Sequence, residues 1–252
     1  MYILYNTISA TTAHDIRAQL EEKTGRRIYL RTTPHPIYPP IIRYGNHEGS
    51  YRNDTLYNSP EFIRMCCDKY ATEMFFIQHN IYNTPNFSQE PPNSDILPFP
   101  VLIRTTLTGH GGVGMTVVNN LEEWNKHWMS YTYWWTPFIN LSSEYRVLIF
   151  DGVPFKIFKK IRADGLEPDL YPIRNIDRGY HFSVRELDKF PNMMDYIQNH
   201  ISTLLTTGFY GLDIGKIQDS EEFFVLELNS APGMNINTSE LLVDRLIEKL
   251  SL

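Results

Sequence analysis

The segment Phe223–Asn229 carries two oxygen-bearing side chains in a setting that otherwise reads as a buried strand. Strand alternation places Phe223, Val225, Glu227 and Asn229 on one face, with Glu227 and Asn229 roughly 7 Å apart. An ionised carboxylate is costly to bury unless a partner or a metal compensates its charge. Carboxylate and amide oxygens suit Mg²⁺, which usually shares its coordination sphere with substrate phosphates. The alternative is an ordinary core ion pair at Glu227 and a turn beginning at Asn229.

Asp213 completes the candidate metal set through a predicted hairpin. Gly208–Gly215 precedes a polar stretch, and a three-residue loop at Asp219–Glu221 would place Asp213 directly opposite Glu227, on the same face. A shift of one residue would turn Asp213 away from that face. The expected metal ligands are therefore Asp213, Glu227 and Asn229.

A glycine-rich stretch, Thr105–Met115, follows a predicted strand and suits contact with phosphate. Glycines let backbone N–H groups approach phosphate oxygens, and this stretch contains Gly109, Gly111, Gly112 and Gly114. It lacks the Gly–Lys–Ser/Thr ending of a Walker A loop, and a strand rather than a helix follows it. We interpret it as a flap over a nucleotide; a mobile hairpin is the alternative.

Basic residues near these elements could bind anions. Arg104 ends the strand that enters the flap, where a guanidinium could grip phosphate with two hydrogen bonds. Arg174, Arg178 and Arg185 lie in a segment of uncertain structure, where an anion site and a solvated loop are equally open.

Asp151–Gly152 is a strong signal for a two-residue hairpin turn. Such a turn predicts that Leu148 pairs with Phe155, Arg146 with Ile157 and Glu144 with Lys159. Three charged side chains then share one face, and two lysines share the opposite face: Glu144, Arg146 and Lys159 on the first, Lys156 and Lys160 on the second. We interpret the first group as a phosphate site, with a solvated sheet edge as the alternative.

The pattern of elements predicts a small α/β lobe over residues 1–95 and a second domain over residues 96–252. Short strands are expected at residues 2–5, 27–32 and 41–44, with helices around His14–Leu20 and Glu61–Phe75. A proline-rich stretch puts the boundary near Asp95. In the second domain, helices are expected at residues 120–130, 192–206 and 240–250.

Composition excludes several classes of function. The 252 residues carry a net charge of −6, which does not indicate a nucleic-acid-binding surface. No apolar run approaches the roughly 20 residues that cross a bilayer, and the chain start does not read as a signal peptide. The two adjacent cysteines, Cys66 and Cys67, suit a reducing compartment. We expect a cytoplasmic protein without membrane partners.

Across residues 96–252 these motifs resemble the ATP-grasp superfamily. The resemblance rests on the strand ending at Arg104 and its glycine flap, Glu144–Arg146, Lys159–Lys160, Gly211–Asp213 and Glu227–Gly233. Their order looks most like the ribosomal-protein-glutamate-ligase-like branch. The Thr–Gly–His–Gly–Gly flap also looks like short ATP-grasp proteins of bacteriophages, which would then act in the host cytoplasm.

The resemblance implies an α+β fold in which two α+β subdomains sandwich the nucleotide, after a smaller α/β lobe. It implies ATP-dependent joining of a carboxylate to an amine through an acyl-phosphate, with Mg²⁺ (or Mn²⁺) held by Asp213, Glu227 and Asn229. Arg146 and Lys159 would contact the phosphates or the acyl-phosphate as catalytic residues. The residues implied in ATP binding are Arg104, Gly109, Gly111, Gly112, Gly114, Pro137, Phe138, Ile139, Glu144 and Lys159.

Two positions depart from the family pattern. Arg104 stands where a phosphate-binding lysine is expected, and the hinge near residues 136–140 lacks an acidic residue beside Phe138. The substrates implied are a carboxylate and an amine, either of which could be a small molecule, a peptide or a protein. Two other functions stay open: a kinase-like phosphotransferase on the same nucleotide site, and a non-catalytic ATP-binding module.

Overall fold

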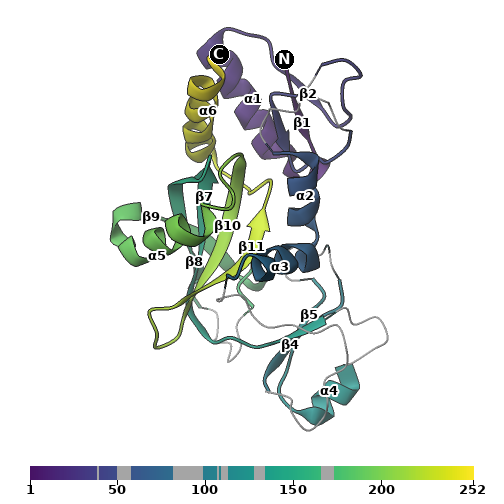
Figure 1. Ribbon diagram of the computed structural model, residues 1–252, viewed down its shortest axis with the longest axis vertical. Helices are drawn as coiled ribbons and strands as arrows, with labels where there is room; N and C mark the ends of the chain where they lie inside the picture. Colours follow the sequence, from purple (N-terminus) through teal and green to yellow (C-terminus); the bar gives the residue numbers. More distant parts are fainter. Residues whose placement is uncertain are drawn as a thin grey trace.

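Three β-sheets follow one another along the long axis of the molecule, with helices packed beside them (Figure 1). The structure is a computed structural model that describes residues 1–38, 40–49, 58–81, 99–106, 108, 113–127, 134–165 and 173–252. Among the described helices, none combines the length and the apolar character that crossing a bilayer requires.

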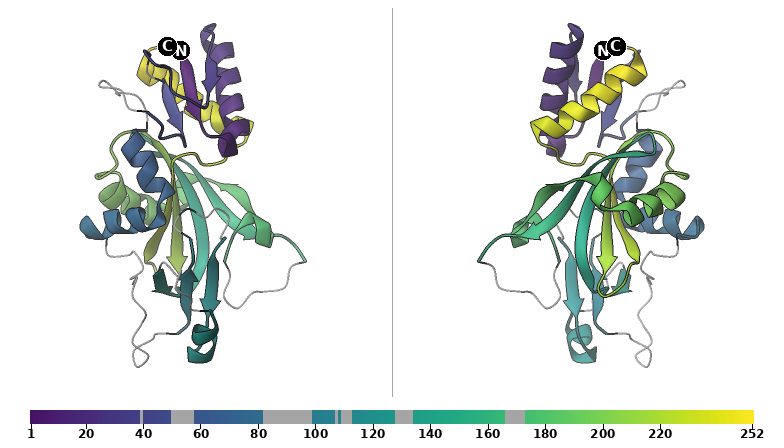
Figure 2. Two further views of the ribbon diagram at one scale, coloured as in Figure 1. Left: turned by 90° about the vertical axis from the view of Figure 1, so that its right-hand side faces the viewer. Right: turned by 90° about the vertical axis from the view of Figure 1, so that its left-hand side faces the viewer.

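The first sheet is parallel, with β1 (Tyr2–Tyr5) between β2 (Tyr29–Arg31) and β3 (Ile42–Tyr44). Helix α1 (Ala10–Thr24) follows the short helix η1 (Thr7–Ser9) and ends where Gly25 adopts a φ of 65°. The chain returns to this lobe at its end: α6 (Ile236–Leu250) packs beside α1 (Figure 2). The predicted α/β lobe therefore contains the last helix, and the boundary expected near Asp95 lies outside the described residues.

The predicted helix at residues 61–75 is two helices, α2 (Pro60–Cys67) and α3 (Lys69–Gln78). Asp68 separates them with an extended backbone, and its carboxylate accepts hydrogen bonds from the N–H groups of Tyr70 and Ala71. A side-chain oxygen that satisfies the free N–H groups of a first turn stabilises a new helix start. The break redirects the chain so that Lys69 begins α3.

The central sheet is antiparallel, in the order β11-β10-β7-β8-β9. Its strands are β7 (Leu141–Phe150), β8 (Val153–Arg162), β9 (Tyr180–Arg185), β10 (Phe209–Ile217) and β11 (Phe223–Asn229). Short helices precede and follow β9: η2 (Ile176–Arg178) and η3 (Leu187–Lys189). One face buries Val147, Ile157 and Leu212 against α3, α5 (Pro191–Tyr196) and the π-turn η4 (Ile197–Ile201). The opposite face packs Leu148, Phe158 and Phe209 against the first lobe and also carries Arg146, Lys160 and Asp213.

A β-bulge changes the expected pairing of β7 with β8. The two-residue turn at Asp151–Gly152 is present, and Phe150 pairs with Val153 as predicted. Beyond the bulge the observed pairs are Leu148–Lys156, Arg146–Phe158 and Tyr145–Lys159, so the three predicted pairs are wrong. One extra residue on one strand moves every later side chain to the other face. Lys160 therefore shares a face with Arg146, and Lys159 points to the opposite face.

The β10–β11 hairpin holds two compensating irregularities. The N–H of Ile217 donates to the carbonyl of Glu222 (3.0 Å), so the loop is one residue longer than expected. A bulge between the Ile214–Val225 and Asp213–Glu227 pairs then restores the predicted pairing of Asp213 with Glu227. Strict alternation along β11 is wrong, because Val225 packs in the core while Leu226 and Glu227 both line a cavity. The predicted neighbours are correct although the predicted loop is not.

The third sheet, in the order β5-β4-β6, is built from β4 (Val101–Arg104), β5 (Met115–Val118) and β6 (Trp134–Pro137). Helix α4 (Leu121–His127) contributes Trp124 to a core with Val101 and Ile103. Residues 138–140 connect β6 of this sheet to β7 of the central sheet, at the position predicted for a hinge. The arrangement is the α+β architecture that the sequence predicted.

Candidate active site

A cavity of about 600 Å³ lies between the three-stranded β5-β4-β6 sheet and the face of the central sheet that carries Arg146 and Asp213. Nine residues predicted from the sequence line this one cavity: Arg104, Pro137, Phe138, Ile139, Glu144, Arg146, Asp213, Glu227 and Asn229. They come from strands far apart in the chain, which the register brings together.

One part of the cavity is apolar. Its walls include Leu102, Met115, Phe138, Ile139 and Ile173. Phe138 is held at the edge of the small sheet, where its N–H donates to the carbonyl of Pro100 (2.8 Å). Apolar walls with a few polar groups at fixed positions are typical of sites for small organic ligands.

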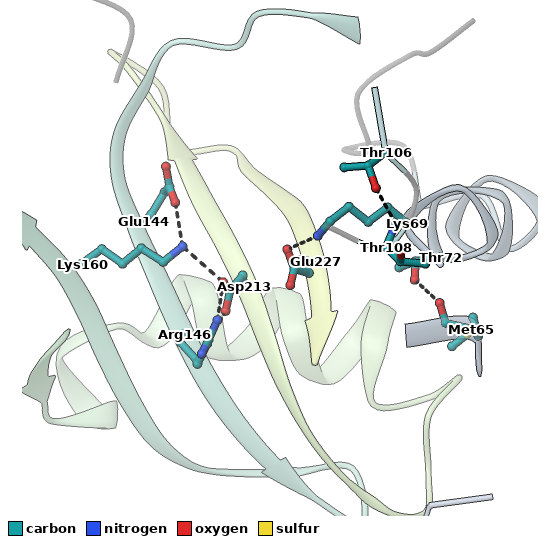
Figure 3. A network of polar contacts seen from close by, with 10 residues as sticks. All are labelled: Met65, Lys69, Thr72, Thr106, Thr108, Glu144, Arg146, Lys160, Asp213 and Glu227. Carbon is teal, nitrogen blue, oxygen red and sulfur yellow. Dashed lines mark hydrogen bonds and ion pairs between the residues drawn. The ribbon is translucent and has the colours of Figure 1, made fainter. Parts of the chain in front are cut away.

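The other part of the cavity is an ion-pair network centred on Asp213, a residue that is 3% exposed (Figure 3). The guanidinium of Arg146 donates from Nε to Oδ1 (2.6 Å) and from Nη2 to Oδ2 (2.9 Å). Lys160 Nζ lies 3.2 Å from Asp213 Oδ2. Burial by itself raises the pKa of Asp213, but Arg146 and Lys160 outweigh it and hold the pKa below its usual range. Asp213 is therefore ionised at neutral pH.

Glu144 extends this network to Arg174. Its carboxylate receives Lys160 Nζ at 3.1 Å and Arg174 Nη1 at 3.1 Å, and Arg174 also donates to the carbonyl of Leu141 (2.7 Å). Phe182 covers the cations from β9, with the Arg146 guanidinium 4.7 Å from its ring centre. Of the three arginines considered from the sequence, Arg174 lines the cavity.

The structure separates Lys159 from this network. Its Nζ lies 5.8 Å from the ring centre of Tyr145, on the face that packs against the helices, and Lys159 does not line the cavity. The bulge in β8 is the physical reason. The lysine that faces the carboxylates is Lys160, which the expected register placed on the wrong side.

Lys69 is a site residue that the sequence did not indicate. Its Nζ lies 2.6 Å from Glu227 Oε2, and its side chain is 18% exposed (Figure 3). The available signal was Asp68, a helix-capping residue inside an otherwise continuous helical pattern. That signal marks a helix start, but it gives no information about a partner far along the chain.

Asp213, Glu227 and Asn229 fit a divalent cation. Asp213 and Glu227 are direct cross-strand partners, and Asn229 follows on the same cavity wall. The amide nitrogen of Asn229 is buried without a hydrogen-bond partner. As a donor it cannot ligate a cation but suits an acceptor such as a phosphate oxygen, and the amide oxygen is the atom that could bind the metal. Among the described residues, no three His, Cys, Asp or Glu side chains gather. The candidate metal ligands are thus two carboxylates and one amide, and one of the carboxylates, Glu227, is paired with Lys69.

Arg104 lies between the cavity and a buried carboxylate. Its guanidinium is 5.6 Å from the Trp134 ring centre. Glu73 of α3 is 9% exposed, and its Oε2 makes no hydrogen bond. Burial raises the pKa of Glu73 to about 8, although Arg104 and Lys69 oppose that rise. Glu73 was not anticipated either.

The predicted flap is described only in part. Gly114 has a φ of 75°, and its carbonyl accepts a hydrogen bond from the N–H of Thr105 (2.8 Å), which closes the base of the β4–β5 connection. Gly109, Gly111 and Gly112 lie outside the described residues.

The chain has the ATP-grasp fold, which its similarity to solved structures shows. It is similar in structure to the ATP-grasp ligase PsnB complexed with minimal precursor, at a TM-score of 0.69 and 11% identity over 99% of this chain and 98% of that one. It is also similar to D-alanine–D-alanine ligase from Bacillus anthracis, at 0.66 and 15% identity over 100% and 98%.

A third neighbour is N5-carboxyaminoimidazole ribonucleotide synthetase from Thermotoga maritima, at a TM-score of 0.58 and 12% identity over 92% of this chain and 68% of that one. No protein-family model matches the sequence. No curated protein matches it either. The similarity therefore concerns the fold alone. The ribosomal-protein-glutamate-ligase-like branch and the likeness to bacteriophage proteins remain predictions.

Proposed function

We propose that this protein is an ATP-dependent ligase that joins a carboxylate to an amine through an acyl-phosphate. The observation that carries the proposal is the shared cavity: one wall is apolar, and the other holds Asp213, Glu227 and Asn229 beside Arg146 and Lys160. The fold agrees with it, since the structural neighbours are themselves ligases by name.

In this proposal the adenine lies against the Phe138–Ile139 segment and the phosphates extend toward the ion-pair network. Arg104, Arg146 and Lys160 would contact phosphate oxygens, because these three cations line the cavity. A guanidinium matches phosphate oxygens with two parallel hydrogen bonds, whereas a lysine acts as a point charge. Lys160 takes the role first expected of Lys159.

Asp213, Glu227 and Asn229 would hold Mg²⁺, or Mn²⁺ in its place. The metal, when bound, would draw charge from the phosphate oxygens and align the triphosphate. Neighbour structures of PsnB are complexed with Mg and ADP, which agrees with this assignment.

The reaction consists of two displacements. A carboxylate oxygen of the substrate attacks the γ-phosphorus, the bond from that phosphorus to the oxygen of ADP breaks, and an acyl-phosphate forms. The amine nitrogen then attacks the acyl carbon and loses a proton, and inorganic phosphate leaves. Arg146 and Lys160 would neutralise charge on the transferred group in both steps. The glycine flap would exclude water, which hydrolyses the intermediate.

The substrates could include a peptide. PsnB has been solved with a precursor peptide, which makes a peptide carboxylate a natural first candidate here. ATP use and the two free cysteines, Cys66 and Cys67, fit the expected cytoplasmic location.

The test is the release of ADP and phosphate with panels of acids and amines, for the wild type and Glu227→Ala. We expect release that needs both substrates and falls at least about 100-fold in the variant. Equal turnover in the two proteins contradicts the proposal. A stable phosphorylated product without an amine would indicate a phosphotransferase. A higher melting temperature with Mg·ATP and no turnover would indicate a binding module.

A further inference from the structure

A second cavity, of about 270 Å³, adjoins the first one at Ile8, Glu227 and Asn229, which line both. It lies where the first turn of α1, the α2–α3 junction and the segment after β11 meet. Its other lining residues include Ser9, Thr12, Lys69 and Ser230. Nothing in the proposed ATP site uses this space.

The charges in the second cavity are few and defined. Among its described lining residues Lys69 is the one cation and Glu227 the one acid, and they pair at 2.6 Å. The remaining polar groups are hydroxyls and amides, which bind a ligand without opposing its charge.

The Lys69–Glu227 pair conflicts with a metal at Glu227. If Glu227 ligates a divalent cation, the Lys69 ammonium loses the ion pair that it makes among the described residues, while its side chain is only 18% exposed. A charge that is removed from water and left unpaired is costly. A carboxylate in the second cavity would pair with Lys69 and remove that cost. An ammonium ligand would be repelled by Lys69 instead.

We propose that the second cavity binds the carboxylate substrate, and that Lys69 recognises it by exchanging Glu227 for the substrate's carboxylate. This inference rests on the proposed function, because it names the site from which the acid meets the γ-phosphate. The volume is smaller than that of sites for drug-sized ligands, about 300–1,000 Å³. The ligand is therefore a small acid, or the last residue of a longer one.

The exchange couples the two ligands. A carboxylate that draws Lys69 away makes Glu227 available to the metal, and a bound metal makes Lys69 available to the carboxylate. Such coupling is reciprocal, and its usual size is about fivefold or more in affinity. Removing the Lys69 charge should therefore abolish the coupling between metal and carboxylate binding, while the metal still binds.

The experiment measures Mn²⁺ affinity from the electron paramagnetic resonance signal of free Mn²⁺, in the presence of AMPPNP. Propionate is the carboxylate probe, and propionamide is its neutral counterpart of the same shape. In the wild type we expect propionate to tighten Mn²⁺ binding about fivefold and propionamide to leave it unchanged. In Lys69→Met we expect tight Mn²⁺ binding without propionate and no further change with it.

Lys69→Arg and Lys216→Met serve as controls. Lys69→Arg keeps the charge and should keep the coupling. Lys216 pairs with Glu221 at the far end of the β10–β11 hairpin, so Lys216→Met should behave like the wild type. Melting curves establish that each variant folds.

Equal propionate effects in wild type and Lys69→Met, or an equal effect of propionamide, overturn the inference. So does the absence of any propionate effect in the wild type. If Mn²⁺ fails to bind the wild type more tightly than it binds Asp213→Asn, the metal site of the proposed function is itself wrong, which is a separate outcome from loss of coupling.

Discussion

The guanidinium of Arg146 holds the carboxylate of Asp213 through two bonds of 2.6 and 2.9 Å between directly paired residues of β7 and β10. Both groups lie in the wall of the proposed nucleotide site. In the proposed site the same pair would orient a cation that contacts phosphate and a carboxylate that binds the metal. Removing this ion pair should lower both the free energy of unfolding and the activity.

Asp213→Asn should lower the free energy of unfolding by about 3–5 kcal/mol, since Arg146 and Lys160 are left near a neutral group. Because the folded pKa of Asp213 is depressed, its contribution is full above the unfolded pKa of about 3.9 and is lost as pH falls through the folded pKa. Urea unfolding should show a constant difference between about pH 5 and pH 8 that narrows only below about pH 4. A difference that vanishes at neutral pH would contradict the ion-pair assignment.

Lys160→Met should lower ADP release at least about 100-fold, because Lys160 faces Asp213 and Glu144 in the cavity. Lys159→Met is the matched control: the neighbouring lysine lies over the Tyr145 ring on the opposite face, and its loss should change turnover less than about twofold. Kinetics of the two variants under identical conditions check the register. A larger loss of turnover in Lys159→Met than in Lys160→Met would contradict the observed register and favour the pairing first predicted from the two-residue turn.

Glu73→Gln should stabilise the protein, and increasingly so as pH rises. A carboxyl whose folded pKa is raised, here to about 8, stays protonated in the folded state while the unfolded chain ionises above about 4.3. Between the unfolded and the folded pKa, the free energy of unfolding of the wild type therefore falls by about 1.4 kcal/mol per pH unit. We expect the variant's advantage to be near zero at about pH 4 and above about 2 kcal/mol at pH 8.

Unfolding midpoints of wild type and Glu73→Gln across this pH range provide the measurement. Glu61→Gln, on the exposed first turn of α2, is the control: a backbone hydrogen bond lowers the pKa of Glu61, so this variant should not gain stability over the wild type as pH rises. A pH-independent difference for Glu73→Gln would mean that Arg104 and Lys69 keep Glu73 ionised.

Arg104→Met should raise the KM for ATP about tenfold or more, since a charge-assisted contact to phosphate contributes about 1.5–3 kcal/mol. Arg104→Lys should lose less, because it restores the charge though not the stacking over Trp134. Initial rates over a range of ATP concentrations distinguish the two variants. If both keep the wild-type KM, Arg104 does not contact the nucleotide.

The sequence was sufficient for features that depend on residue type and local pattern. The Asp151–Gly152 turn and the strands β1 and β5 were predicted in this way. The placement of Asp213 opposite Glu227 was also predicted, but from a loop one residue too short, and the bulge in β11 restored the pairing. Turn chemistry and the alternation of apolar with polar residues act over a few neighbouring positions, so these signals are present in the chain itself.

Only the tertiary structure decided which charged side chains meet. The bulges in β8 and β11 leave no signal in residue type, yet each one changes the face of every residue beyond it, and so Lys160 replaced Lys159. Lys69 reaches Glu227 because α3 packs on the central sheet, which is a contact between segments distant in sequence. Packing between such segments depends on the whole fold, and local pattern does not encode it.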